Sequence, residues 1–200
     1  MRGKIGFIAD FFDILGGAEK NDNVLINHLS HNFEVIRIES HLCTAPKVDL
    51  CDILIVGNFI NLSEEMKTYI SANKKYIIYE HDHKYVKTRD PSKYTNFKIP
   101  ENKIINKSFY KNASAVVVLS KICKEVLSEN LGLQNIHNIG TSLWSDQKLN
   151  KIETLLENKK EINCGVLGSE NPIKGKTSAL VWCKEKNITP ELISSNNEEK

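Results

Sequence analysis

Two histidines and two acids follow one another in the segment Glu80-His81-Asp82-His83. A neutral imidazole can hydrogen-bond a hydroxyl group, and an imidazolium can offset negative charge that develops on a substrate. In an extended segment residues i and i+2 share a face, so we expect His81 and His83 to point together and the acids to point away. No third ligand follows at a familiar metal-binding spacing. Substrate contact is the leading interpretation, and a structural histidine in a loop is the alternative.

The pair Gly16-Gly17 stands between an apolar run and an amphipathic segment. Glycines allow a backbone to approach a ligand closely, and free N–H groups at a helix N-terminus attract phosphate. The pattern is not GxGxxG, so the dinucleotide fingerprint is absent. A turn before a helix is the commoner use of such a pair.

A second candidate for phosphate contact is Lys174, which stands at the predicted start of a helix, where the helix dipole favours an anion. The neighbouring Gly175-Lys176-Thr177 has the ending of a phosphate-binding loop. That loop needs four residues between its glycines, whereas Gly168 and Gly175 enclose the six residues 169–174. The mismatch disfavours a P-loop NTPase.

The elements that position these residues are predicted from short apolar runs that alternate with amphipathic stretches. The pattern predicts strands over 4–9, 33–38, 52–56, 76–79, 115–119 and 135–139. It predicts helices over 17–29, from Ser63 onward, over 104–112, and from a Ser120 cap to 130. Near-continuous apolar strands between helices predict an α/β fold with a Rossmann-like, doubly wound parallel sheet covered on both faces. Ligands of such sheets bind outside the carboxyl ends of the strands.

The alternation stops after residue 140 and restarts with a strand over 162–167, a helix over 174–186 and a strand from 190 to 194. We therefore expect a first domain over 1–144, a linker helix over 145–161, and the truncated beginning of a second Rossmann-like domain over 162–200. One strand–helix–strand unit is too small to be stable alone. The alternative is an extra unit added to the first sheet.

The composition is that of an ordinary globular protein, with 40% hydrophobic and 26% charged residues and a net charge of +2. This balance argues against a nucleic-acid partner. No apolar stretch is long enough to span a bilayer, which leaves peripheral membrane contact open. The five cysteines show no CxxC spacing, and their odd number indicates free thiols in a reducing compartment, so we expect a cytoplasmic protein.

Taken in order, several segments resemble family 4 of the glycosyltransferases with the two-Rossmann-domain (GT-B) fold. The resemblance covers nearly the whole chain, and the matching segments are loose motifs that occur in a consistent order. They are Gly16-Gly17-Ala18-Glu19 opening a helix, His81 at a strand tip, the valine-rich strand ending in Ser120, the turn Asn138-Ile139-Gly140, and Gly165-Val166-Leu167-Gly168 followed by Lys174-Gly175.

The resemblance implies a GT-B N-terminal domain followed by the beginning of the donor domain. It implies transfer of a sugar from a nucleotide diphosphate sugar to an acceptor hydroxyl, with retention of configuration and without metal or cofactor. His81 would contact the donor sugar or the reacting centre as the catalytic residue, and Lys174 would meet the donor diphosphate. The expected substrate-binding residues are Gly16, Gly17, Asp82, His83 and Ser120.

Two departures bear on this expectation. Ser169 stands where the family usually has an arginine, and the family's downstream glutamate motif lies beyond the sequence. Because most of the donor pocket would be missing, we expect the chain alone to have negligible transferase activity. The alternatives are a non-catalytic sugar- or protein-binding fragment of a degenerate transferase, and another nucleotide-binding α/β enzyme such as an NTPase or a nucleotide-sugar epimerase.

Overall fold

The computed structural model describes residues 2–14, 16–157, 164–170 and 174–193. The chain divides into two compact units, Met1–Ser145 and Asp146–Lys200. The sequence pattern predicts a first domain over 1–144 and a separate linker helix over 145–161, whereas the residues from Asp146 onward all belong to the second unit here.

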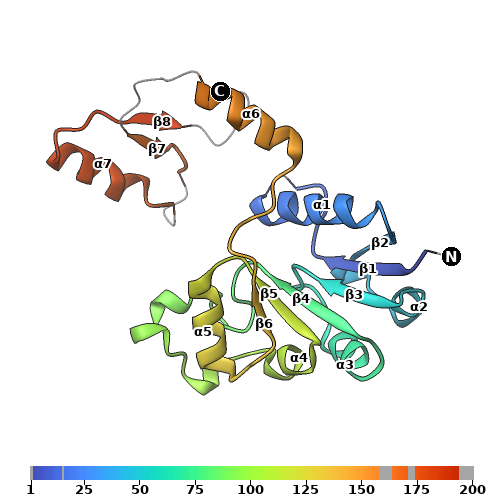
Figure 1. Cartoon of the computed structure of the whole chain (residues 1–200). Helices are drawn as coiled ribbons and strands as arrows, with labels where there is room; N and C mark the ends of the chain where they lie inside the picture. The colour runs from blue at the N-terminus through green and yellow to red at the C-terminus, as the bar shows by residue number, and fades with distance from the viewer. Residues whose placement is uncertain (1, 15, 158–163, 171–173, 194–200) are drawn as a thin grey trace. The chain divides into compact units, whose positions relative to one another are not determined.

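The first unit is built on a six-stranded parallel sheet, so the predicted α/β, Rossmann-like class is confirmed at this level (Figure 1). The strand order is β2-β1-β3-β4-β5-β6. The strands are β1 (Lys4–Ala9), β2 (Glu34–Glu39), β3 (Ile53–Val56), β4 (Tyr76–Glu80), β5 (Ala115–Val118) and β6 (Ile136–Asn138). The direction of winding reverses between β1 and β3, and ligands of doubly wound sheets bind at the carboxyl ends of the strands on either side of such a reversal.

Successive side chains of a strand point to opposite faces of a sheet, and helices cover both faces of this one. They are α1 (Gly17–Leu29), α2 (Ala45–Asp49), α3 (Glu64–Asn73), α4 (Lys107–Asn112) and α5 (Lys121–Leu131). A small core cluster joins Phe7 and Tyr79 to Ile26 of α1. A larger cluster on the other face joins strand residues such as Ile8 to helices α2 to α5. Figure 1 shows α1 on one side of the sheet and α3 and α4 on the other.

Local signals position the helix ends. Ser63 and Ser120 accept hydrogen bonds from the third residues of α3 and α5, at 3.2 Å in both cases. These serines satisfy backbone donors that would otherwise lack a partner, which explains why both helices begin there. Gly132 ends α5 in the left-handed conformation, with φ of 67°.

The predicted elements match the structure closely where a segment is long enough to show its hydrophobic period. Both β1 and α1 have the predicted bounds, and the other strands of the first sheet differ by one residue at most at each end. Helix α4 begins at residue 107 rather than 104, because Asn106 has a left-handed backbone. Helix α2 was not predicted, since its five residues are too few to show a helical period. Short 3-10 turns, also not predicted, cover Ser40–Leu42, Pro91–Lys93, Thr95–Phe97 and Glu101–Lys103.

The second unit contains α6 (Asp146–Glu157), β7 (Gly165–Leu167), α7 (Lys176–Glu185) and β8 (Glu191–Ile193). Strands β7 and β8 pair in parallel in a sheet of their own, and the described strands do not extend the first sheet. Parts of the predicted linker helix and strand, residues 158–163, and residue 194 of the predicted last strand lie outside the described residues. Within the described part of the chain, no helix has the length and apolar character that a membrane span requires.

Candidate functional site

Asp10, the residue directly after β1, ties three loops together at the carboxyl edge of the sheet. Its side chain accepts hydrogen bonds from the backbone N–H groups of Ile60, at 3.0 Å, and Asn61, at 2.9 Å, both in the loop after β3. It also accepts from the hydroxyl of Ser40, directly after β2. Sequence reasoning missed this role, although an acid that directly follows a buried strand is a usable signal. The carboxylate fixes the edge at which ligands of such sheets bind.

Two buried oxygens lie at the reversal of winding. Asp22 of α1 packs against Gly57, directly after β3, so closely that a Cβ on Gly57 would lie 3.0 Å from Asp22 Oδ2. Asp22 Oδ2 has no hydrogen-bond partner among the described residues. The same is true of Oδ1 of Asn58, the residue that follows Gly57. A third such oxygen, Asn23 Oδ1, follows Asp22 on α1. Burying an acceptor without a donor costs about 1–3 kcal/mol, so a donor from a water molecule or from a ligand would stabilise these atoms.

His81 lies beside these acceptors, just beyond the end of β4. Its Nε2 donates to Asp22 Oδ1 at 2.7 Å, and the two side chains are 6% and 2% exposed. The ring also packs edge-on against Tyr79, with centroids 4.7 Å apart. Asp22 therefore holds the imidazole in one orientation, and the side chain of His81 is largely enclosed.

The chain leaving β6 returns to this edge. Asn21 of α1 accepts from the hydroxyl of Tyr79 at 2.7 Å and from the backbone N–H of Leu143 at 3.4 Å. Burial, with the nearby charge of Asp22, raises the pKa of Tyr79 to about 12. Tyr79 therefore stays protonated and donates, which keeps Asn21 oriented.

The glycine pair opens α1 as predicted. Gly16 is the N-cap, with an ordinary φ of −79° and no side-chain capping bond. The carboxylate of Glu19 occupies the space that a Cβ on Gly16 would need, while the space beside Gly17 is open. An acid at this position interacts favourably with the helix dipole. A phosphate at this helix start would have to displace the Glu19 carboxylate.

Asp82, a predicted substrate-binding residue, belongs to a charge network. The ammonium group of Lys84 donates to Glu80 Oε1 at 2.8 Å and to Asp82 Oδ1 at 2.7 Å, and the Lys84 side chain is 2% exposed. Arg89 Nη1 donates to Asp82 Oδ2 at 3.1 Å. The hydroxyl of Tyr110 donates to Glu80. Asp82 thus pairs with two cations of its own chain.

The network sets the protonation of its buried members. Burial alone would raise the pKa of Glu80, but the charge of Lys84 and the bonds from Lys84, Tyr110 and the Asp82 backbone lower it to about 2. Burial would likewise lower the pKa of Lys84, and the charges of Glu80 and Asp82 raise it above its ordinary value. Both groups are therefore charged at neutral pH.

The expectation that His81 and His83 share a face is wrong. His81 contacts α1, whereas His83 Nδ1 lies 3.1 Å from the hydroxyl of Tyr85, and Nε2 lies 3.7 Å from Sγ of Cys123 on α5. The two helices cover opposite faces of the sheet. The cause is local, because β4 ends at Glu80, residues 81 and 82 form a bend, and His83 has a φ of 55°.

The remaining predicted site residues are Ser120 and Lys174. Ser120 uses its hydroxyl to cap α5 through the N–H of Cys123. Lys174 is exposed and lies in the second unit, where Gly175, with φ of 71°, caps α7. The helix begins at Lys176, two residues later than predicted, and Lys176 pairs with Glu170 at 2.5 Å. Within the described ranges, no group of three or more His, Cys, Asp or Glu side chains is arranged to hold a metal ion.

The structure thus brings His81 to Asp22 on the α1 side of the sheet, beside Gly57 of the loop that carries Asn58. It places His83 against α5 on the opposite face, where Ser120 caps that helix. No protein-family model matches the sequence, and neither curated proteins nor solved structures yield a significant match.

Proposed function

We propose that this chain is the acceptor side, and the beginning of the donor side, of a GT-B glycosyltransferase. It would move a sugar from a nucleotide diphosphate sugar to an acceptor hydroxyl, with retention of configuration and without metal or cofactor. The doubly wound sheet of the first unit and the motifs that resemble family 4 support this proposal. The free thiols of all five cysteines fit the reducing cytoplasm.

One observation carries the proposal: the buried oxygens of Asp22 and Asn58 at the reversal of winding have no donor among the described residues. A carboxylate oxygen and an amide oxygen only accept hydrogen bonds. A ligand that fits them offers several O–H groups, as a sugar does. A phosphate does not fit, because the carboxylate of Asp22 would repel it.

In this proposal His81 acts from a fixed position. Asp22 orients the ring through Nε2, and Nδ1 would be the atom that meets the reacting centre. The hydrogen bond is charge-assisted, which gives the ring a defined geometry without further partners. The donor diphosphate would be met by Lys174 of the second unit rather than by Gly16, where Glu19 already supplies a negative charge.

The test measures the nucleoside diphosphate that is released from UDP-glucose, UDP-N-acetylglucosamine or GDP-mannose, with simple sugars as acceptors. It compares this chain with the longest natural reading frame that contains it. We expect negligible turnover by the 200-residue chain and, where the reading frame is longer, measurable transfer by the longer protein. Transfer should fall at least tenfold in Asn58→Ala, which removes one acceptor at the edge. A longer protein that neither binds nor turns over any of the three sugars contradicts the proposal.

A sugar-binding module without turnover is the second candidate. The observation that favours it is the 6% exposure of the His81 side chain, which leaves little of the ring for a substrate. Calorimetric titration of the longer protein with the same sugars distinguishes the two, because the module would bind without releasing nucleotide.

A further inference from the structure

Cys123, His83 and Tyr85 form a cluster that the proposed transfer reaction does not use. Cys123 is the third residue of α5, and its Sγ lies 3.7 Å from Nε2 of His83. Nδ1 of the same ring lies 3.1 Å from the hydroxyl oxygen of Tyr85. A thiol next to an imidazole that a third group orients is the arrangement of an activated nucleophile.

The orienting residue is firmly held. The side chain of Tyr85 is fully buried and packs edge-on against His83, with ring centroids 5.6 Å apart. Burial, with the charge of Glu80 nearby, raises the pKa of Tyr85, so its hydroxyl stays protonated. Its oxygen can accept from the Nδ1–H group of His83, which leaves Nε2 to take the proton of the thiol.

The surroundings of Cys123 favour its thiolate. The hydrogen bond with His83 lowers the pKa of the thiol, against partial burial, which raises it. The first turn of α5 adds the positive end of the helix dipole. Burial instead raises the pKa of Cys43, to about 11, and also that of Cys51 and Cys183.

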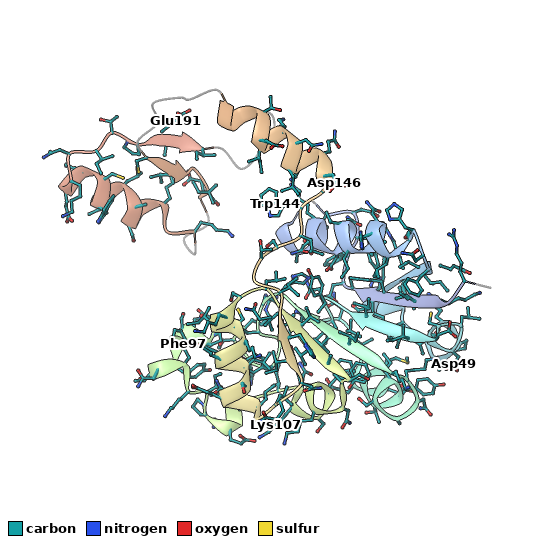
Figure 2. The ribbon with its side chains drawn as sticks, viewed as in Figure 1. Asp49, Phe97, Lys107, Trp144, Asp146 and Glu191 are labelled. Carbon is teal, nitrogen blue, oxygen red and sulfur yellow. The ribbon has the colours of Figure 1, made fainter. Side chains whose placement is uncertain are left out.

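A cavity of about 360 Å³ adjoins the thiol. Its apolar wall includes Phe97, labelled in Figure 2, with Ile122 and Val126, and its polar wall includes His83, Arg89 and Ser92. The volume is at the lower end of the range for small-molecule sites. Arg89 donates to Asp82 through Nη1, and Asp90 also lines the cavity. The remaining N–H groups of the Arg89 guanidinium suit a ligand that carries a carboxylate, and the apolar wall suits its carbon skeleton.

We propose that Cys123 is a nucleophilic thiol, activated by His83, that exchanges with a small carboxylate-bearing disulfide in this cavity. The product is a mixed disulfide on Cys123. This modification site lies on the α5 side of the sheet, on the opposite face from the contact between His81 and Asp22 of α1, so it stands whether or not the transferase proposal holds.

The exchange balances within the cluster. The thiol proton of Cys123 passes to Nε2 of His83, and the thiolate attacks one sulfur of the incoming disulfide. The bond between the two incoming sulfurs breaks as the new S–S bond forms. The departing thiolate takes the proton back from the imidazolium and leaves as a small thiol, so no further oxidant is needed.

The rate should follow the titration of the cluster. The groups that face Cys123 and His83 are Tyr85 and Glu80 from β4 and its loop, and Arg89 and Asp90 from across the cavity. Glu80 disfavours the thiolate and His83 favours it, with the larger effect from His83. We therefore expect the reaction with disulfides to persist at a pH below that at which an ordinary thiol loses its reactivity.

The experiment follows the thiopyridone that the intact chain releases from dithiodipyridine under native conditions. We expect one fast equivalent, absent in Cys123→Ser and retained in the matched control Cys164→Ser. His83→Asn is the test of activation, because asparagine tolerates the left-handed backbone while removing the imidazole. It should slow the fast phase about tenfold and move the midpoint of its pH profile upward.

Tyr85→Phe provides a second test that keeps the packing, and it should slow the fast phase by a smaller factor. Thermal melts of all variants separate lost activation from lost folding. Incubation with oxidised glutathione, followed by peptide mass mapping, should place the adduct on Cys123. The proposal is overturned by a fast phase that survives in Cys123→Ser, by an unchanged rate and pH profile in folded His83→Asn and Tyr85→Phe, or by a glutathione adduct that forms elsewhere or not at all.

Discussion

At the scale of single residues, the two oxygens of Asp22 have different tasks. Oδ1 accepts from His81, whereas Oδ2 lies against Gly57 with no partner among the described residues. A carboxylate this deeply enclosed is stabilised by its one strong bond. The pair is therefore important both for stability and for the function that we propose.

We expect His81→Ala to lower kcat about a hundredfold in the longest reading frame that contains the chain, as the loss of one transition-state donor does. It should also lower the free energy of unfolding by about 1–3 kcal/mol, because Asp22 would remain buried without a donor. Steady-state kinetics and thermal melts measure the two effects. The exposed His137→Ala is the control. Normal kcat with an early melt would assign His81 a purely structural role.

The pKa of Glu80 gives a prediction of acid stability. Since its folded pKa, about 2, is below its ordinary value, the associated stability is present above about pH 4.3 and is lost as the pH falls toward 2. Unfolding by urea at several pH values should show a loss on the order of 3 kcal/mol over this range.

The double variant Glu80→Gln, Lys84→Met removes both buried charges and should flatten this part of the pH profile. Glu101→Gln, which removes a carboxylate whose side chain is 74% exposed, should leave the profile unchanged. If the double variant loses as much stability between pH 4.3 and 2 as the unmodified chain, another group is responsible.

At the scale of elements, the helices begin where a side chain satisfies the first backbone donors. Ser63 and Ser120 make the same bond at the starts of α3 and α5. Only Ser120 was also a predicted substrate-binding residue. The two serines therefore form a matched pair, because both cap a helix and only Ser120 was predicted to bind substrate.

Ser63→Ala and Ser120→Ala should each lower the free energy of unfolding by about 1 kcal/mol, the usual value of such a cap. Because the Ser120 hydroxyl is engaged with Cys123, we expect neither substitution, made in the longest reading frame that contains the chain, to change KM for a nucleotide sugar. Denaturant unfolding and steady-state kinetics give the two quantities. A raised KM in Ser120→Ala alone would restore its substrate-binding role.

At the scale of the whole molecule, the two units differ in how much core they contain. Both hydrophobic clusters lie within Met1–Ser145. In the described part of the second unit, Val166 and Cys183 are the buried hydrophobic residues, while Trp182, Leu192 and Ile193 are exposed. A small core supplies little stability against the entropy of an ordered chain.

A chain truncated after Ser145 should keep a cooperative thermal transition within a few degrees of that of the 200-residue chain. Residues 146–200 expressed alone should show none. Circular dichroism and calorimetry measure both. A cooperative melt of the second unit alone would show that the residues outside the described ranges complete a core.

The local part of this architecture could be predicted from the sequence. Apolar runs identified the strands, the spacing of apolar residues identified α1, and serines at the right positions identified the starts of α3 and α5. These signals act over a few residues, so no knowledge of the fold is needed to interpret them. They also placed His81 correctly at the end of a strand.

The partners of the candidate residues were decided only by the tertiary structure. Asp22 and His81 are 59 positions apart, and Asp10 is 50 positions from Ile60, so their contacts depend on the order of the strands. The bend after β4, together with the left-handed backbone at His83, directs this residue to the opposite side of the sheet from His81 and against Cys123. Sequence periodicity determines which residues form strands and helices, but strand order and single backbone dihedrals determine which side chains meet, because both depend on packing between distant segments.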